Sequence, residues 1–365
     1  MKLGIIGLSN SGKTTIFNAL TGQNLETTIY ASVAAEPAYG VVKVPDGRID
    51  SLASIFKPKK TTYATVEYVD YLGLTKGDIA QNRKVFDLVK DVDAIVHVVR
   101  AFPDDAVVHP MQSVDAMRDL ETLALELIFG DLEFVEKRLE RMAEAAKKGK
   151  KPGDDEKKLL EKCREALEKE IPLRNISFTD DEMKAMRHMQ FVSMKPEVVV
   201  LNLAEDMLNS DAACELQQSA AKYFSDKGSA NMARVVTLCG KIEMEIAQLA
   251  SDEAKAFLDD LGIIEPALNM LIHVSYELLG YISFLTAGED EVRAWTIRKG
   301  LAAQQAAGKI HSDIERGFIR AEVVAYDDFM TDGGMSGARD KGHLRLEGKT
   351  YEVKDGDIIN FRFNV

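Results

Sequence analysis

The stretch that decides the fold is Gly7-Leu8-Ser9-Asn10-Ser11-Gly12-Lys13-Thr14. Its spacing, G-x-x-x-x-G-K-T, is that of the phosphate-binding loop, or P-loop, of nucleoside triphosphatases. Residues 2–6 before it are typical of a short buried strand, and residues 14–20 after it have helical character. An accidental glycine-rich turn is not expected between two such elements, so the sequence predicts a strand–P-loop–helix unit.

The residue types of this loop explain its chemistry. Glycines let consecutive backbone N–H groups converge on a polyphosphate, and the next helix points its positive end at the same anion. The lysine adds a positive charge, and the hydroxyl after it can coordinate Mg²⁺. We therefore predict that phosphate is contacted by Asn10, Ser11, Gly12, Lys13, Thr14 and Thr15, and that Thr14 is also a ligand of Mg²⁺.

Composition restricts the class of protein. A length of 365 residues favours roughly two to three domains, and 46% apolar with 29% charged residues is typical of a soluble globular chain. No apolar run reaches the ~20 residues that cross a bilayer, and the three scattered cysteines indicate reduced thiols. We expect a cytoplasmic protein without a membrane partner. The net charge of −13 disfavours wrapping by nucleic acid, so we expect no sequence-specific DNA binding and only a local basic patch for a ribosomal or RNA partner.

A second motif follows a predicted strand at residues 65–70. Asp70-Tyr71-Leu72-Gly73 has the pattern D-x-x-G, in which the aspartate holds Mg²⁺ through water and the glycine N–H contacts the γ-phosphate. The pattern is weak alone but gains weight after a P-loop, so we predict Asp70 as a metal ligand and Gly73 as a phosphate contact. Leu74 stands where many GTPases have a water-orienting glutamine. Because leucine cannot orient water, either another group does so or hydrolysis is slow.

One histidine is a candidate for that role. His97 interrupts residues 93–100, an apolar stretch typical of a central parallel strand. A histidine in such a strand is more often a satisfied core residue than a catalyst. Because the strand neighbours the phosphate site, we keep His97 as a candidate catalytic residue that positions water.

A helical hairpin is predicted from residue 125 onward. Apolar residues recur at steps of three and four from Leu125 to Ala146, as in the seam of a coiled coil, and resume from Leu160 to Ile171. The lysine- and glycine-rich residues 147–155 between them predict a turn. The helices are expected to run antiparallel. The lysines at the tip are equally compatible with phosphate binding and with simple solvation.

The base-binding loop is expected after a strand at residues 196–201. GTPases carry N-K-x-D there, whose aspartate accepts both guanine donors, whereas this chain has Asn202-Leu203-Ala204-Glu205. The longer carboxylate changes the geometry that pairs with guanine and should weaken its selection. Asn202, Leu203 and Glu205 are predicted to contact the base, and Cys239 and Gly240 to close over it from the strand and loop at residues 235–241. Strands that alternate with helices predict a doubly wound α/β sheet.

The C-terminal residues 281–365 are predicted to form another unit. Strands at 291–297 and 318–325 flank a short helix at 302–311, and residues 351–353 and 358–363 are expected to pair as a hairpin around Asp355-Gly356. A small mixed sheet with one helix suggests a ubiquitin-like β-grasp fold.

Together these features resemble the YchF, or Obg-like ATPase, family of translation-factor-related P-loop proteins. The resemblance rests on Gly7–Thr14, Asp70–Gly77, His97–Arg100, Asn202–Glu205 and, most strongly, the run from Thr286 to Ala321, which is similar to the family's TGS domain. It implies a doubly wound P-loop domain at 1–130 plus 191–280, an inserted antiparallel helical hairpin at 131–190, and a β-grasp TGS domain at 281–365.

The resemblance also implies a function. Members of the family hydrolyse ATP in preference to GTP, depend on Mg²⁺ and associate with the ribosome. They carry an apolar residue in place of the catalytic glutamine, which Leu74 matches, and His97 stands where the family offers a histidine as substitute. The resemblance therefore implies a Mg²⁺-dependent ATPase that acts as a slow regulatory switch, with ribosome or ribosomal RNA as partner.

Two departures mark a divergent member of that family. Ala34 stands where the family has a threonine two residues before Glu36-Pro37, and residues 77–82 contain one glycine where the family's segment is glycine-rich. Both departures fall on switch elements, so nucleotide binding should survive them better than fast hydrolysis. Two alternatives stay open: a nucleotide-gated adaptor with little hydrolysis, and a GTPase with relaxed base selectivity.

Overall fold

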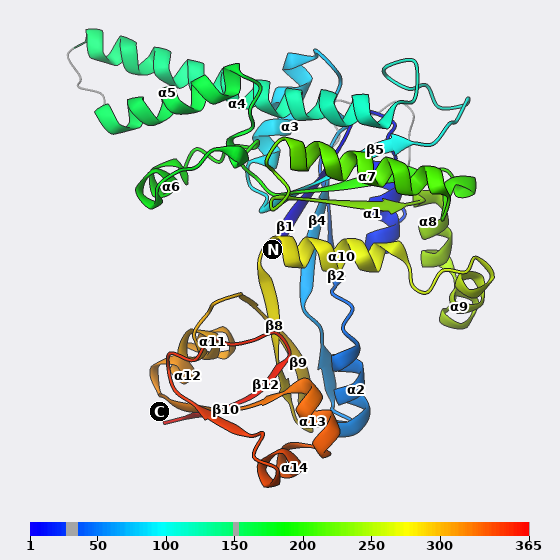
Figure 1. Ribbon diagram of the computed structural model, residues 1–365, viewed down its shortest axis with the longest axis vertical. Coiled ribbons are helices and arrows are strands. Elements are labelled where there is room, and N and C mark those ends of the chain that lie inside the picture. The colour runs from blue at the N-terminus through cyan, green and yellow to red at the C-terminus, as the bar shows by residue number, and fades with distance from the viewer. Residues whose placement is uncertain (27–35, 149–152, 365) are drawn as a thin grey trace. The chain divides into compact units, whose positions relative to one another are not determined.

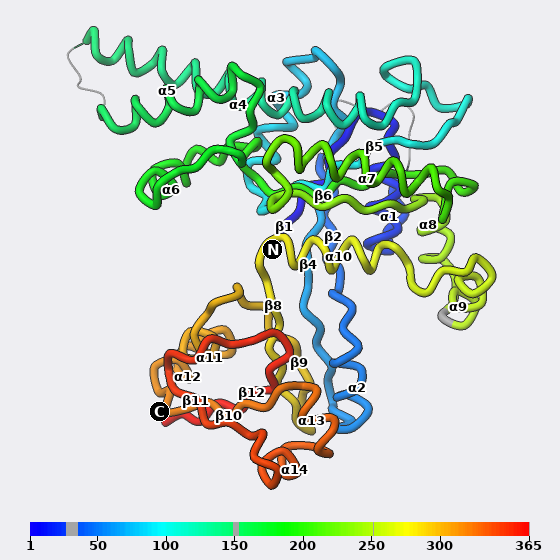
Figure 2. The backbone as a smooth tube through the Cα atoms, in the orientation of Figure 1, coloured from blue at the N-terminus to red at the C-terminus, as the bar shows by residue number. Residues whose placement is uncertain are grey.

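The computed structural model describes residues 1–26, 36–148 and 153–364, which form two compact units (Figures 1 and 2). The first unit contains residues 1–42 and 67–271, and the second contains residues 43–66 and the chain from residue 272 onward. The finer domain limits predicted from the sequence stay predictions. Ala34 and the centre of the lysine-rich tip lie outside the described residues. None of the helices in the described part of the chain combines the length and the apolar character that crossing a bilayer requires.

A six-stranded sheet forms the centre of the first unit, in the order β2-β4-β1-β5-β6-β7. Its strands are β2 (Ala38–Lys43), β4 (Thr65–Asp70), β1 (Lys2–Ile6), β5 (Ala94–Ala101), β6 (Glu197–Leu203) and β7 (Ala233–Leu238). From β4 to β7 every neighbouring pair is parallel. Because parallel strands all end at one edge, the loops after β1, β4, β5 and β6 gather there. The predicted α/β P-loop fold is confirmed.

Helices connect and cover these strands (Figure 1). The P-loop helix α1 packs against α8, while α4 and α7 contribute buried side chains to one core cluster with β5 and β6. β5 and β6 are buried at every residue, as expected for central strands with both faces covered. The helices of this part are α1 (Lys13–Thr21), α3 (Ile79–Val89), α4 (Ala116–Lys147), α5 (Asp154–Glu168), α6 (Asp180–Met186), α7 (Asp211–Asp226), α8 (Gly240–Gln248) and α9 (Ser251–Asp260). α10 (Ala267–Leu278) begins in the first unit and continues into the second.

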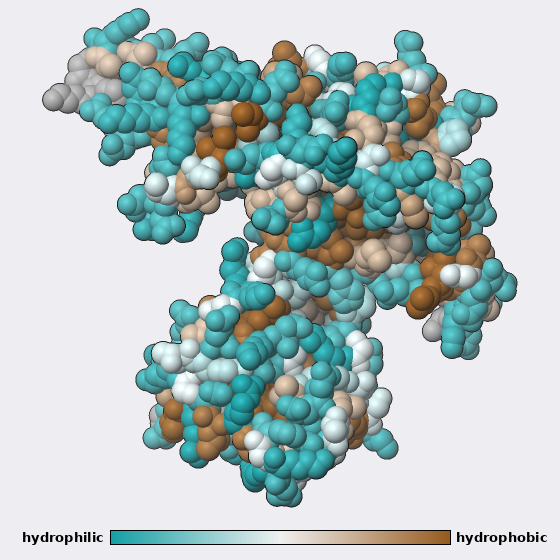
Figure 3. Space-filling view, viewed as in Figure 1, coloured by the Kyte–Doolittle hydropathy of each residue, from teal (hydrophilic) through white to brown (hydrophobic). Residues whose placement is uncertain are grey.

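The long helix α4 and the returning helix α5 form the predicted hairpin. The buried seam contains Ile128, Val135 and Met142 of α4 with Leu160, Cys163 and Leu167 of α5. An ion pair at 2.8 Å joins Arg138, in the last third of α4, to Glu156, in the first turn of α5, as expected for antiparallel helices on either side of a turn. α5 ends earlier than expected, at Glu168, and Ile171 is exposed. Away from the seam, the visible face of the hairpin is largely hydrophilic (Figure 3).

The second unit is built on another six-stranded sheet, in the order β11-β10-β12-β8-β9-β3. Its strands are β11 (Arg345–Glu347), β10 (Phe318–Ala325), β12 (Asp357–Phe363), β8 (Tyr281–Ala287), β9 (Glu291–Arg298) and β3 (Lys60–Thr62). β12 is parallel to β8 and antiparallel to β10, and α11 (Ala303–Ile310) buries its alanines on the sheet. A central parallel pair flanked by antiparallel strands and covered by one helix is the predicted β-grasp arrangement. Short helices complete the unit: α2 (Gly47–Phe56), α12 (Ser312–Arg316), α13 (Tyr326–Asp332) and α14 (Met335–Asp340).

The prediction of a β-hairpin around Asp355-Gly356 is wrong. Glu352 makes only an isolated bridge with Ala302, while β12 pairs with β8 and β10. The reason is the buried carboxylate of Asp357, which accepts hydrogen bonds from the Tyr351 hydroxyl at 2.8 Å and from the Lys354 N–H at 2.9 Å. These bonds fold residues 351–357 into a compact loop instead of a second strand.

Candidate functional site

The P-loop follows β1 and ends in the first turn of α1. Asn10 and Gly12 have φ angles of 63° and 93°, in the left-handed region. This conformation turns successive N–H groups toward one side and makes a concavity for an anion. Gly12 is the N-cap of α1 and has no side chain to occupy the first N–H groups of the helix. The backbone therefore supports the predicted phosphate contacts of residues 10–15.

Lys13 is buried in this loop, with 7% of its surface exposed. Its Nζ donates to the carbonyl of Leu8 at 2.9 Å. Burial, against the attraction of Asp70, lowers the pKa of Lys13 to about 8. Gly73 lies against the same ammonium, because a Cβ built on Gly73 would come within 3.0 Å of Nζ and 2.8 Å of the Cα of Ser9. The structure thus brings together the lysine and the glycine that were predicted to meet the phosphates.

The two residues predicted to hold Mg²⁺ contact each other. The Thr14 hydroxyl donates to Asp70 Oδ2 at 2.7 Å, and Asp70 Oδ1 is buried without a hydrogen-bond partner among the described residues. Burial raises the pKa of Asp70, opposed by the Thr14 hydrogen bond and by Lys13. A hydroxyl and a carboxylate with a spare oxygen are donors that Mg²⁺ takes in P-loop sites, directly or through water. The residues therefore fit this ion, and the described chain has no cluster of three or more His, Cys, Asp or Glu for another metal.

Leu74 is turned away from this site. Its N–H donates to the carbonyl of Gly7 at 2.9 Å, and its carbonyl accepts from the N–H of Ser9 at 3.1 Å. The backbone of Leu74 is therefore hydrogen-bonded to the start of the P-loop. The side chain is fully buried in a core cluster that includes Ile6 and Phe86. It contributes to packing and cannot act on a water at the phosphates.

The D-x-x-G segment is tied to α3 and α4 by side chains for which the sequence had no motif. Gln81 Nε2 donates to the carbonyl of Gly73 at 2.8 Å. Glu126 of α4 accepts from the N–H of Gly77 at 3.0 Å and from Asn82 Nδ2 at 2.8 Å. Gly73 is therefore hydrogen-bonded directly to α3, and the segment that follows it is hydrogen-bonded to α4 through Glu126.

Asn202 joins the P-loop to the last strand. Its Nδ2 donates to the carbonyl of Ser11 at 3.0 Å, and its Oδ1 accepts from the N–H of Gly240 at 2.9 Å. Both ends of the buried amide are thus used inside the protein. The predicted base-binding residues Asn202 and Gly240 lie together beside the P-loop, and Asn202 joins that loop to the N-terminus of α8.

The other predicted base-binding residues are divided between core and surface. Leu203 and Cys239 are buried in two different core clusters, so their side chains face away from solvent. Glu205 is exposed, and its Oε2 lies 3.8 Å from Lys241 Nζ. Of the predicted base-binding residues, only Glu205 has an exposed side chain.

His97 lies inside the sheet, with 1% of its surface exposed. Its Nδ1 is 2.9 Å from Glu197 Oε1, and the other oxygen of Glu197 is paired with Arg174 at 2.5 Å. Burial alone would raise the pKa of Glu197, but Arg174 and His97 hold it at about 2. This geometry favours the structural interpretation of His97 over the catalytic one.

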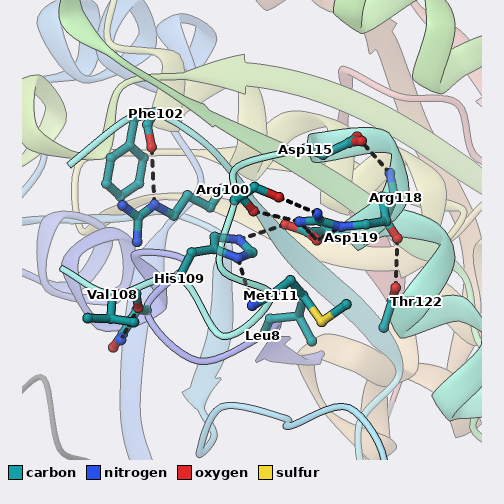
Figure 4. Close-up of polar contacts among 12 residues, drawn as sticks. Leu8, Arg100, Phe102, Val108, His109, Met111, Asp115, Arg118, Asp119 and Thr122 are labelled. Atoms are coloured by element: carbon teal, nitrogen blue, oxygen red, sulfur yellow. Dashed lines mark hydrogen bonds and ion pairs between the residues drawn. The ribbon is translucent and has the colours of Figure 1, made fainter. Parts of the chain in front are cut away.

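A second histidine, not predicted from the sequence, lies on the loop that follows β5 (Figure 4). That loop contacts the P-loop, because Asn10 Nδ2 donates to the carbonyl of Val108 at 3.0 Å. The next residue, His109, accepts from the N–H of Met111 at its Nδ1, at 3.0 Å, and contacts Asp119 with its Nε2 at 2.8 Å. Burial, against the attraction of Asp119, lowers the pKa of His109, so the ring is neutral and carries its proton on Nε2. Its only sequence signal is its place after a strand that ends at the phosphate edge.

Arg100 holds this loop in shape. Its guanidinium donates to the carbonyls of Phe102, Asp104 and Val107 at 3.0–3.1 Å. Three bonds from one buried arginine fix the backbone that leads to Val108 and His109, which explains why the loop can meet the P-loop at a defined place.

Comparisons with known proteins agree with this geometry. Residues 2–128 match the family model described as 50S ribosome-binding GTPase, and residues 281–364 match YchF-GTPase_C, described as a protein of unknown function (DUF933). The ribosome-binding ATPase YchF of Bacillus subtilis is 44% identical over 365 residues, which is 99% of each chain. That of Escherichia coli O157:H7 is 41% identical over 368 residues, covering 100% of this chain and 99% of the relative. The solved structure of the Schizosaccharomyces pombe YchF GTPase, 29% identical, has a TM-score of 0.80 and covers 99% of this chain and 97% of its own. The P-loop site, the inserted hairpin, the β-grasp unit and this full-length identity lead to one conclusion: the chain belongs to the YchF family.

Proposed function

We propose that the protein is a Mg²⁺-dependent ATPase that prefers ATP to GTP and acts as a slow regulatory switch on the ribosome, in the cytoplasm. The observation that carries the proposal is the buried Lys13 beside Gly73, next to the Thr14–Asp70 pair. The relatives from B. subtilis and E. coli are named ribosome-binding ATPases, which supports the nucleotide and the partner.

In this proposal, different residues bind the phosphates, the metal ion and the base. The N–H groups of residues 10–15 and the Lys13 ammonium bind and orient the β- and γ-phosphates, and Gly73 presents its N–H to the γ-phosphate. Thr14 and Asp70 would hold Mg²⁺, which when bound neutralises phosphate charge. Asn202 keeps the base-side loops against the P-loop, and Glu205 meets the base. The fully buried Leu74 supplies no group for the attacking water, which supports slow hydrolysis.

Nucleotide preference gives the direct test. In competition against a labelled ATP analogue, ATP is expected to displace it at least about tenfold better than GTP, a difference of about 1.4 kcal/mol. Glu205→Asp, which restores the carboxylate geometry of GTPases, should reduce that ratio. The neighbouring exposed Asp206→Glu is the matched control and should leave it unchanged. A GTP preference in the wild type would favour the alternative of a GTPase with relaxed selectivity.

The two histidines are expected to differ in their effect on hydrolysis. We propose that His109, on the loop that contacts Asn10, positions the attacking water after it leaves Asp119. His109→Ala should lower the single-turnover rate by about 100-fold, the usual contribution of a positioned general base or its water, and leave ATP affinity nearly unchanged. His97→Asn should lower thermal stability and leave the rate constant of the folded protein within about twofold. A loss of rate in His97→Asn with His109→Ala unaffected would reverse this assignment.

The same measurement decides whether the protein is an enzyme or an adaptor. The specific observation in favour of an adaptor is the burial of Leu74 in the core. Single-turnover hydrolysis is therefore measured with and without ribosomes. Stimulated cleavage that requires His109 supports the switch, whereas nucleotide-dependent ribosome binding without stimulated cleavage supports the adaptor.

A further inference from the structure

A second cleft lies on the first unit, away from the P-loop residues. It has a volume of about 330 Å³ and is formed by α3, α4 and the segment at residues 188–192. Its floor is apolar, with Phe86, Leu127 and Phe134. Gly130 shapes it, because a Cβ there would come within 2.7 Å of the Phe86 ring. This volume is at the lower end of the range for small-molecule sites.

The acids that line this cleft are already engaged. Asp131 is buried and accepts from the N–H groups of Val192 and Ser193 at 3.0 and 2.7 Å. Glu133 is shared between two cations, Lys137 and Arg83, the latter at 3.7 Å. One carboxylate between two cations leaves an excess of positive charge at the rim.

Other basic residues line the rim, and two of them are already paired with acids. Lys90 is paired with Asp87 at 2.6 Å, and Arg138 with Glu156. Arg141 and His188 also line the cleft, and within the described ranges neither side chain has a hydrogen-bond or ion-pair partner. The rim therefore carries a local excess of positive charge, from Arg141 and from the Arg83–Lys137 pair that shares Glu133. This excess is unusual on a chain whose net charge is −13.

We propose that this cleft is a second anion site, which takes the phosphate of a nucleotide at Arg141, Lys137 and His188 and the organic part of that nucleotide against the Phe86–Phe134 floor. Arginine is suited to phosphate because its planar fork makes two parallel hydrogen bonds. The nucleotide is either free or part of an RNA strand, since both present the same phosphate and base.

The cleft is connected to the P-loop site through α3. Arg83 and Phe86, on the wall of the cleft, lie two and five residues beyond Gln81 in the same helix. Gln81 donates to the Gly73 carbonyl at 2.8 Å. A ligand that changes the position of α3 therefore changes the environment of Gly73. This part of the inference rests on the proposed function. It requires that ATP and the second ligand alter each other's affinity by the same factor.

Binding is tested in two backgrounds that remove the P-loop from the measurement. One is Lys13→Met, and the other is the wild type saturated with a non-hydrolysable ATP analogue and Mg²⁺. Adenosine 5′-monophosphate, inorganic phosphate and a short single-stranded oligoribonucleotide are titrated by calorimetry. Arg141→Gln should weaken nucleotide binding at least about tenfold. Lys158→Gln, which removes the same charge from an exposed position of α5 outside the cleft, should not.

The outcomes are separable. Monophosphate binding that depends on Arg141 supports a free nucleotide, and oligoribonucleotide binding alone that depends on Arg141 supports an RNA source. Absence of binding by all three probes, or equal binding in Arg141→Gln, overturns the site. Failure of the protein to bind ATP would overturn the proposed function but would leave the result in Lys13→Met intact. Binding without any change in ATP affinity would overturn only the connection through α3.

Discussion

Lys13→Met is expected to weaken ATP binding by about 100-fold or more. Each hydrogen bond to a charged group contributes about 1.5–3 kcal/mol, and in the proposed site the ammonium donates to more than one phosphate oxygen. The side chain is buried and its Nζ lies beside Gly73. Equilibrium binding of a fluorescent ATP analogue measures the effect. Binding within about threefold of the wild type would show that the phosphates lie elsewhere.

The same variant should fold at least as well as the wild type. Burial lowers the pKa of Lys13 to about 8, so the protein without nucleotide carries a charge in an unfavourable environment. Methionine has similar length and no charge, which removes that cost. Thermal unfolding without nucleotide is therefore the control, because a lower midpoint would mean that the loss of binding reflects misfolding.

Arg174→Met is expected to destabilise the fold by about 3–5 kcal/mol, the range for leaving one member of a buried ion pair without its partner. Glu197 is held by Arg174 at 2.5 Å and by His97 at 2.9 Å, and all three side chains are almost fully buried. The double variant Arg174→Met, Glu197→Gln should recover much of the loss, since no charge remains buried. Arg187→Ala is the control, because it removes an exposed arginine from the same segment between α5 and β6. Its free energy of unfolding should stay within about 0.5 kcal/mol of the wild type. Urea unfolding at pH 7 measures all of them.

The pH dependence of this pair has a definite sign. The pKa of Glu197 in the folded protein is about 2, below its ordinary value of 4.5. A lowered carboxylate pKa stabilises the fold at pH values above the ordinary value, and this stabilisation is lost as the pH falls toward 2. The gap in stability between the wild type and Arg174→Met should therefore be widest near neutrality and shrink below about pH 4.5. A gap that widened on acidification would contradict the assignment.

Most of the fold could be predicted because its elements carry local signals. The P-loop spacing and the apolar runs of β5 and β6 specify a parallel sheet whose loops meet at one edge. The coiled-coil seam specifies the hairpin. The turn motif at Asp355-Gly356 predicts a hairpin that does not form, because a turn motif does not identify which strand the next segment joins. That choice depends on the Asp357 carboxylate and on distant partners in β8 and β10.

The site was predictable only where function imposes a sequence motif. Lys13, Thr14, Asp70 and Gly73 follow from spacing, and the structure brings them together. His97 was a reasonable candidate from strand order, but strand order cannot reveal Glu197, which lies 100 residues away. His109, which we propose positions the attacking water, has no motif of its own, because its place depends on the loop that Arg100 shapes. The cleft at Arg141 depends on three segments that only packing brings together.

Glu126 connects the long helix α4 to the phosphate site. It is hydrogen-bonded to the segment that carries Gly73, and the same unbroken helix of 32 residues continues to Lys147. At 1.5 Å per residue, the arm beyond Glu126 is about 30 Å long, so a tilt of about 5° at its base would move its end by about 3 Å. A small tilt at Glu126 would therefore move the far end of this helix by several times the shift of the groups beside Gly73.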